Sequence, residues 1–483
     1  MRLVLYVLNG IVAVLACWTL AYHFMLFSRL PSGWIFIPFA LITIPVVGAL
    51  NRWRGSRVTG RGVKEALPVL VLGLTVGLFS MIAGRTNIDD YPFFHRAAFQ
   101  LQHLDQPIFL THTGDNVAGL PPQSQFHITS SIEPLTAFLG HWLHVDPLWV
   151  YQKGLCPVYG ILLVCAYYVL YRQVRLRPAW ALACTALGLI FLTFDGNEPR
   201  SFGSWSIVHY WQGKVMLVIV WVVLLLFYSL RYLRMPTRAN FFAAALCVVS
   251  AVGLSGSGLY IDVIVVGALL ASFVAANGFR KWSLRRAVSL SPILIYPCMI
   301  VGAAFVGLLP HFSDFSVWVS GWPATWVASI KLVVPNKLIF ARWTLAAFVL
   351  SFFVLRGRAK AILIYPFAIV VLCLNGIAGP VWMKLIYPGA YWRLVYAIPS
   401  PWFAGLSARL FGRTKTAWIG AAFIAFSAGA ANSTRLIRGQ ALYIRVLGAF
   451  VFGPSIGRFI SKPKAICMRA ICWPPRGLNA LPH

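Results

Sequence analysis

Long apolar runs alternate with polar connections along most of this chain. Many of the runs approach the ~20 residues that an α-helix needs to cross a bilayer. They lie at residues 3–25, 34–50, 66–84, 153–171, 179–194, 215–230, 240–254, 259–277, 288–309, 338–355, 361–377, 395–411 and 417–432. The pattern predicts an all-α, polytopic integral membrane helix bundle with about 13 transmembrane helices, in a range of about 12–14.

The connections between these runs are of two kinds. One kind is short and basic, at residues 52–64, 172–178, 231–238, 279–286, 356–360 and 412–416. The other is rich in aromatic residues, Gly and Pro, at residues 85–152, 195–214, 255–258, 310–337 and 378–394. Because Lys and Arg collect in cytoplasmic loops, we expect the basic connections and the N-terminus to be cytoplasmic and the other connections to face outward.

The domain organisation follows from the same pattern. Residues 1–432 are expected to form a single multi-spanning domain, and residues 433–483 a basic C-terminal tail. A weaker apolar run at 440–457 leaves open whether one further segment crosses or re-enters the membrane. In the first long outward loop, 85–152, Ala97–Leu101 and Ile132–Leu139 have the amphipathic pattern of short helices that lie at the membrane interface.

The composition supports the membrane class. The chain is 59% hydrophobic and only 11% charged, whereas a soluble domain carries about 25% charged residues. The net charge of +30 would suit a nucleic-acid binder. However, basic cytoplasmic loops and their attraction to anionic lipids account for it better, so we expect a lipid bilayer partner and no nucleic acid.

Acidic residues are rare and unevenly placed. Of the 11 in the chain, six lie in the first long outward loop: Asp89, Asp90, Asp105, Asp115, Glu133 and Asp146. Asp195, Glu198, Asp262 and Asp314 also lie in or beside outward connections, and only Glu65 lies on the expected cytoplasmic side. The positive-inside rule does not require this, since acids contribute little to orientation. Function is therefore expected on the outer face.

Asp89 and Asp90 are the candidate catalytic residues. Two adjacent carboxylates can hold a divalent cation such as Mg²⁺ or Mn²⁺ through hard oxygen ligands. Alternatively, one can act as a general base while the other orients it or shifts its pKa. A third interpretation is structural: either Asp could cap a helix that begins at Tyr91-Pro92, with Pro in the first turn. The capping and chemical roles are compatible, because one Asp suffices for the cap.

Three outward cations are candidate contacts for a substrate phosphate: Lys214, Arg393 and Arg200. Lys214 ends the stretch Trp211-Gln212-Gly213-Lys214, and Arg393 ends Tyr391-Trp392-Arg393. Arginine can bind a phosphate through two parallel hydrogen bonds, which lysine cannot do. The alternative for Lys214 is a snorkelling anchor at the membrane surface, assisted by Trp211.

These residues resemble a known class. A polytopic chain with Asp89-Asp90 after an outward helix exit, followed by a long loop of interfacial helices, resembles the GT-C membrane glycosyltransferases. It also resembles an uncharacterised family of bacterial multi-spanning proteins, through Asp89-Asp90, Trp211–Lys214 and Tyr391–Arg393, over about residues 60–412. The resemblance implies a sugar donor on a polyprenyl phosphate, transfer at the outer face of a bacterial inner membrane, and an acid in the first outward loop. In better-known GT-C members this loop follows the first helix, whereas here it follows the third.

The leading hypothesis is therefore a glycosyltransferase-like enzyme. Asp89 or Asp90 would activate the acceptor hydroxyl or hold a metal on the donor phosphate, and the cations would neutralise the leaving group. A transporter or flippase for a lipid-linked or anionic solute is the alternative, with Asp262 in an apolar run as one polar residue that such a protein would need. A non-catalytic cell-envelope assembly protein is the third possibility.

Overall fold

The computed structural model of this chain describes residues 1–52, 60–84, 91–108, 128–195, 200–306, 308, 325–333, 345–346, 348–349, 351, 355, 360–386 and 391–406. The chain divides into two compact units, Met1–Arg435 and Leu436–His483. All of the described residues belong to the first unit, so the tail and the run at 440–457 lie outside them.

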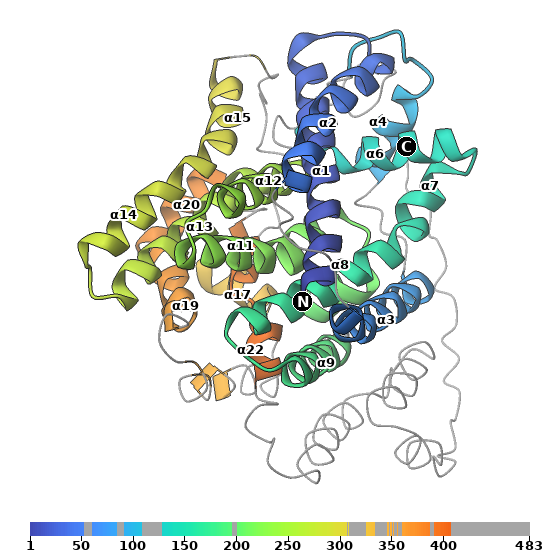
Figure 1. The fold of residues 1–483 in the computed structure, drawn as a ribbon. Coiled ribbons are helices and arrows are strands. Elements are labelled where there is room, and N and C mark those ends of the chain that lie inside the picture. Colours follow the sequence, from blue (N-terminus) through green and yellow to red (C-terminus); the bar gives the residue numbers. More distant parts are fainter. Residues whose placement is uncertain are drawn as a thin grey trace, which may run out of the picture. The chain divides into compact units, whose positions relative to one another are not determined.

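Every regular element of the described residues is helical (Figure 1). The α-helices are α1 (Arg2–Ser28), α2 (Phe36–Arg52), α3 (Gly60–Ala83), α4 (Tyr91–Gln100), α6 (Ile132–Leu143), α7 (Pro147–Trp149), α8 (Cys156–Gln173), α9 (Pro178–Phe194), α10 (Gly213–Met216), α11 (Val222–Arg234), α12 (Arg238–Leu254), α13 (Gly258–Ala276), α14 (Lys281–Leu290), α15 (Ile295–Phe305), α17 (Trp326–Val333), α19 (Lys360–Leu372), α20 (Ala378–Ile386) and α22 (Ser400–Leu406). Short 3₁₀ elements are η1 (Ser32–Ile35), η7 (Ser291–Leu294) and η9 (Trp392–Ala397). Short π-helical elements are η3 (Val150–Gly154), η5 (Ser204–Val208) and η6 (Leu217–Trp221).

Seven helical segments of the described residues are long and apolar enough to cross a membrane. They are Arg2–Ser28, Ser32–Leu50, Gly62–Ala83, Pro147–Gln173, Gly213–Arg234, Gly258–Ala276 and Lys281–Ala304. Three shorter apolar helices lie at Pro178–Thr193, Arg238–Leu254 and Lys360–Leu372. The all-helical, multi-pass membrane class is therefore confirmed, whereas the count of about 13 spans stays a prediction.

The segment Gly213–Arg234, which comprises α10, η6 and α11, is the most enclosed of these spans. Within its most apolar window, 94% of the residues are buried inside the protein. Its last part, α11, packs beside α8, α12 and α13 (Figure 1). By contrast, only 11% of the corresponding window of Ser32–Leu50 is buried, so most of that helix lies on the surface of the protein.

Helices α3 and α8 pack against each other backbone to backbone. A Cβ atom added at Gly160 of α8 would lie 2.3 Å from the backbone nitrogen of Gly77 in α3. One added at Gly73 would lie 2.6 Å from the Cα atom of Ile161. Small residues four apart allow this close approach, which is a common way for membrane helices to associate.

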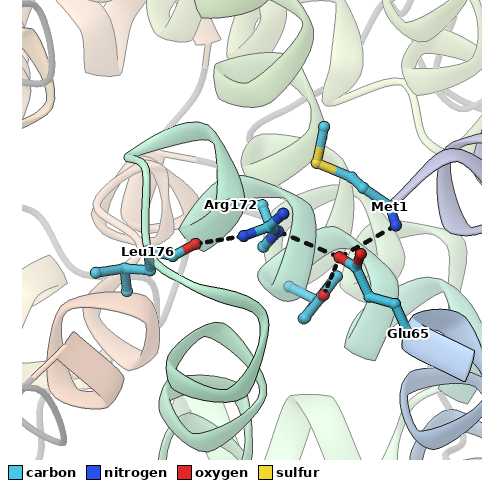
Figure 2. A network of polar contacts seen from close by, with 5 residues as sticks. Met1, Glu65, Arg172 and Leu176 are labelled. Carbon is cyan, nitrogen blue, oxygen red and sulfur yellow. Dashed lines mark hydrogen bonds and ion pairs between the residues drawn. The ribbon is translucent and has the colours of Figure 1, made fainter. Parts of the chain in front are cut away.

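A polar network joins the other ends of the same two helices (Figure 2). The carboxylate of Glu65 accepts a 2.7 Å hydrogen bond from the Tyr168 hydroxyl and lies 3.3 Å from Nε of Arg172. The amino nitrogen of Met1 lies 3.1 Å from the same carboxylate. Glu65, the one acid expected on the cytoplasmic side, thus has a structural role between α3, α8 and the start of α1.

Helices form at both places in the first long loop where the sequence predicts them. α4 includes most of the amphipathic segment Ala97–Leu101, and α6 includes Ile132–Leu139. Their location at the membrane interface stays a prediction. Helix α14 begins earlier than the start of the apolar run at 288–309 predicts. Lys281–Leu290 is an amphipathic helix, so its basic residues interrupt the apolar run while the helix continues.

Candidate functional site

The paired carboxylates Asp89 and Asp90 lie outside the described residues. Helix α4 begins immediately after them, at Tyr91, which is where the capping interpretation places a helix start. Their catalytic and metal-binding roles stay predictions. Among the described residues, no group of three or more His, Cys, Asp or Glu side chains could hold a metal ion.

Arg200 and Arg393 meet at one tryptophan ring. The guanidinium carbon of Arg200 lies 5.3 Å from the centre of the Trp392 ring, and that of Arg393 lies 5.8 Å from it. Both distances fall within the range of a cation–π interaction. Two of the three predicted phosphate contacts, almost 200 residues apart in the chain, are therefore brought together by the fold.

Arg393 is also anchored to the turn between α12 and α13. Its Nη1 donates a 2.5 Å hydrogen bond to the hydroxyl of Ser257, the residue just before α13. The side chain is half-buried. A guanidinium held by a ring and a hydroxyl has lost rotamer freedom before any ligand arrives, so less entropy remains to be lost on binding.

Buried aromatic rings support this pair of arginines. Trp205 contacts Trp392 edge to face at 5.0 Å and stacks on Tyr396 at 4.9 Å, and all three rings are buried. The Tyr396 hydroxyl donates a 2.5 Å hydrogen bond to the backbone oxygen of Arg200. These contacts fix the segment after residue 200 onto η9. We call the set the arginine–tryptophan cluster: Arg200, Trp205, Ser257, Trp392, Arg393 and Tyr396.

Three neighbouring side chains, of Asp195, Ser201 and Tyr391, add polar groups beside the cluster. The buried carboxylate of Asp195 accepts a 3.1 Å hydrogen bond from the backbone N–H of Gly203, and the Ser201 hydroxyl donates to the Asp195 backbone oxygen. Tyr391 donates a 2.6 Å hydrogen bond to the backbone oxygen of Cys373, and burial raises the pKa of Tyr391 to about 12. The Tyr391 phenol therefore stays a neutral donor at physiological pH.

Lys214 begins the enclosed span near the same turn. A Cβ atom added to the preceding residue, Gly213, would lie 1.9 Å from the backbone oxygen of Leu254, at the end of α12. Only a glycine permits the chain to pass so close to Leu254. Gly213 and Arg393 thus approach opposite ends of the short stretch Leu254–Ser257.

The first long loop reaches this stretch as well. The backbone N–H of Ser131 donates a 2.7 Å hydrogen bond to the Gly253 oxygen, and the Ser130 hydroxyl lies 3.3 Å from the Leu254 oxygen. The same hydroxyl donates a 2.6 Å hydrogen bond to the buried carboxylate of Glu133. Three of the connections expected to face outward therefore converge on the α12–α13 turn, which neither hydropathy nor motif spacing indicates.

Helix α1 holds the backbone of Ile128–Ser131, which is non-helical from Thr129 onward, in place. The Tyr22 hydroxyl donates to the Ile128 oxygen at 2.9 Å, and Trp18 Nε1 donates to the Ser131 oxygen at 2.8 Å. His23 Nε2 lies 2.8 Å from the Thr129 oxygen. Side chains of α1 thus satisfy backbone groups that no helix satisfies, as non-helical backbone enclosed within a membrane protein requires.

The geometry assigns the tautomer of His23. A carbonyl oxygen can only accept, so Nε2 carries the hydrogen that points to Thr129. Nδ1 is then an acceptor, and the hydroxyl of Tyr296 in α15 donates to it at 2.5 Å. One buried imidazole therefore links α1, α15 and the end of the first long loop.

The other side of that loop is bound to the short element after α1. The backbone N–H groups of Ser32 and Gly33 donate 2.8 Å hydrogen bonds to the oxygens of Gln106 and Leu104. The amide of Gln100 donates to the Ser32 hydroxyl at 2.8 Å. The segment of α1 and η1 thus binds the chain both before and after residues 109–127, which lie outside the described residues.

Comparison with known proteins adds no assignment to this geometry. No protein-family model matches the chain, and no curated protein matches it. The similarity to GT-C glycosyltransferases accordingly stays a prediction from the residues quoted for it.

Proposed function

We propose that this protein is a GT-C-like glycosyltransferase, which transfers a sugar from a polyprenyl-phosphate donor at the outer face of a bacterial inner membrane. The observation that carries the proposal is the placement of Arg200 and Arg393 on the single ring of Trp392, with Arg393 held by Ser257. A pre-positioned pair of guanidinium groups suits the phosphate of a lipid-linked substrate.

The chemistry of sugar transfer explains why such a pair would be useful. As the glycosidic bond to the phosphate breaks, negative charge develops on the polyprenyl-phosphate leaving group. Guanidinium groups already oriented toward that charge stabilise the transition state without reorganising. In this proposal, Arg393 and Arg200 contact the phosphate, and Lys214, near the other end of the α12–α13 turn, adds a third positive charge.

The carboxylates complete the proposed reaction. Asp89 or Asp90 takes the proton of the acceptor hydroxyl as that oxygen attacks the sugar carbon. Alternatively, the pair binds Mg²⁺ or Mn²⁺, which would screen the donor phosphate. The N-terminus is cytoplasmic in this proposal, and α4 and α6 lie at the outer membrane surface, where a lipid-linked sugar would enter.

A deletion strain complemented with variants tests the proposal. Asp89→Asn and Asp90→Asn are each expected to abolish transfer, seen as accumulated lipid-linked sugar and missing surface glycan. Arg393→Gln is expected to reduce transfer strongly and Arg393→Lys less so, because lysine keeps the positive charge but cannot make two parallel hydrogen bonds to one phosphate. Arg280→Gln, at an exposed arginine before α14, is the matched control. Normal glycan in both aspartate variants, at equal membrane expression, would sink the proposal.

A transporter or flippase is the second candidate, and Asp262 is the observation that favours it. This carboxyl group lies inside the apolar helix α13 with no exposed surface. Transport of lipid-linked sugar, measured as its appearance on the outer leaflet of proteoliposomes, distinguishes this function from transfer. A cell-envelope assembly protein without chemistry would show neither activity.

A further inference from the structure

Asp262 is the most unusual polar residue of the bundle interior. It lies in the second turn of α13, and its exposed fraction is 0%. Neither carboxyl oxygen has a hydrogen-bond partner within the described part of the chain. An ionised carboxylate without a partner is among the costliest groups to bury, and ionisable residues inside membrane spans are usually functional.

The register of two antiparallel helices places Asp262 opposite Cys247. A Cβ atom added at Gly258 of α13 would lie 2.5 Å from the backbone oxygen of Ala251 in α12, so these two residues face each other. One helical turn further into the bundle, α13 reaches Asp262 and α12 reaches Cys247. Cys247 is completely buried. Its thiol is a weak hydrogen-bond donor and carries no positive charge.

The tyrosine hydroxyls on the helices around α13, which are stronger hydrogen-bond donors than a thiol, donate to other acceptors. Tyr228 on α11 donates to Asn9, Tyr296 on α15 donates to His23, and Tyr365 on α19 donates to the Ala397 oxygen. Arg393 on η9 is held by Ser257. No ion pair of the described residues includes Asp262. Within the described part of the chain, the surroundings therefore supply neither a positive charge nor a hydroxyl hydrogen to this carboxyl.

We propose that Asp262 is a proton-binding site inside the bundle, occupied as the neutral carboxylic acid. With its proton bound, the group carries no net charge and costs far less to bury than the anion. Its place in the second turn of α13, below Ser255–Ser257, puts the proton one turn beneath the arginine–tryptophan cluster. Sugar transfer uses no proton at this position, whereas a proton-coupled transporter would use a buried carboxylic acid inside the bundle.

Infrared spectroscopy of the protein in lipid is the deciding experiment. The spectrum of wild-type protein at neutral pH is expected to contain the carbonyl-stretch band of a protonated carboxylic acid, and Asp262→Asn is expected to lose that band. Asp105→Asn, at an exposed aspartate, is the control and is expected to lose carboxylate intensity only. If Asp262→Asn removes carboxylate intensity and leaves the neutral-acid region unchanged, the proposal is wrong.

Modification with a hydrophobic carbodiimide supplies a second readout that needs no folded variant. The carboxylic acid adds across one C=N bond: its oxygen bonds to the central carbon, and its proton moves to nitrogen. Transfer of the acyl group from oxygen to nitrogen then gives a stable N-acylurea with the summed mass of both reactants. We expect this mass on the peptide containing Asp262, and not with a water-soluble carbodiimide. Should Asp262→Asn fail to fold, an unmodified Asp262 peptide in wild-type protein would overturn the proposal.

Discussion

Arg393 and Ser257 are 136 residues apart in the chain and are joined by a 2.5 Å hydrogen bond. This contact attaches a cation of η9 to the residue just before α13. It also fixes the guanidinium beside the Trp392 ring. The position of the proposed phosphate contact therefore depends on a serine that carries no charge and matches no motif.

Ser257→Ala is expected to weaken binding of a polyprenyl phosphate on the order of tenfold, because the guanidinium loses the partner that orients it. Binding to purified protein in nanodiscs is the measurement. Ser291→Ala is the control, since the Ser291 hydroxyl is exposed and bonds only within its own turn, to the Val288 oxygen, among the described contacts. Equal affinity of both variants would remove Ser257 from the site.

Trp392→Leu is expected to weaken the same binding by about 2- to 30-fold, the equivalent of one cation–π interaction of about 0.5–2 kcal/mol. Leucine keeps an apolar side chain but presents no ring face to Arg200 or Arg393. Trp392→Phe keeps a ring and should retain most of the affinity. A loss that is the same for leucine and phenylalanine would mean that the indole contributes by its size alone.

Gly160→Ala is expected to destabilise the protein by about 1–3 kcal/mol, the usual cost of overpacking a tight contact. The new methyl group would meet the backbone of Gly73 and Gly77. Thermal unfolding in detergent measures the effect. Gly267→Ala in α13 is the matched control, because no atom lies within 4 Å of the Cβ position there.

His23→Phe is expected to destabilise the end of the first long loop by about 1–3 kcal/mol for each polar partner left unpaired, the Thr129 oxygen and the Tyr296 hydroxyl. Hydrogen exchange of residues 128–133 should become faster, since the loop segment loses one of its anchors. His141→Gln, at an exposed histidine of α6, should leave exchange there unchanged. Unchanged exchange in His23→Phe would show that Trp18 and Tyr22 suffice.

Much of the helical framework could be predicted from the sequence. The apolar runs at 3–25 and 179–194 correspond to α1 and α9 with boundaries close to those observed. An apolar run can be recognised from neighbouring residues alone, so the position of such a helix can be predicted without knowing what packs against it. The same method stops short at α14, where basic residues interrupt the apolar run while the helix continues.

The candidate site was predictable only in its parts. The cations Arg200 and Arg393 stand out because they lie in loops expected to face outward, against the usual distribution of charge. Their meeting on Trp392 could not be predicted, because nothing in a single sequence states which loops touch. Glu133 was visible as one of six clustered acids, and its partner Ser130 lies only three residues before it. The contact of Ser130 with the Leu254 oxygen at the end of α12 depends on tertiary packing.

The first helix has a mechanical consequence for the proposed site. Helices α1 and η1 bind the chain on both sides of residues 109–127. A rigid displacement of α1 and η1 would therefore move both attachment points together. The backbone of Ile128–Ser131 is in turn attached to the end of α12, because the Ser131 N–H donates a hydrogen bond to the Gly253 oxygen. A continuous line of contacts therefore runs from α1 through Ser131 and the α12–α13 turn to Ser257 and Arg393.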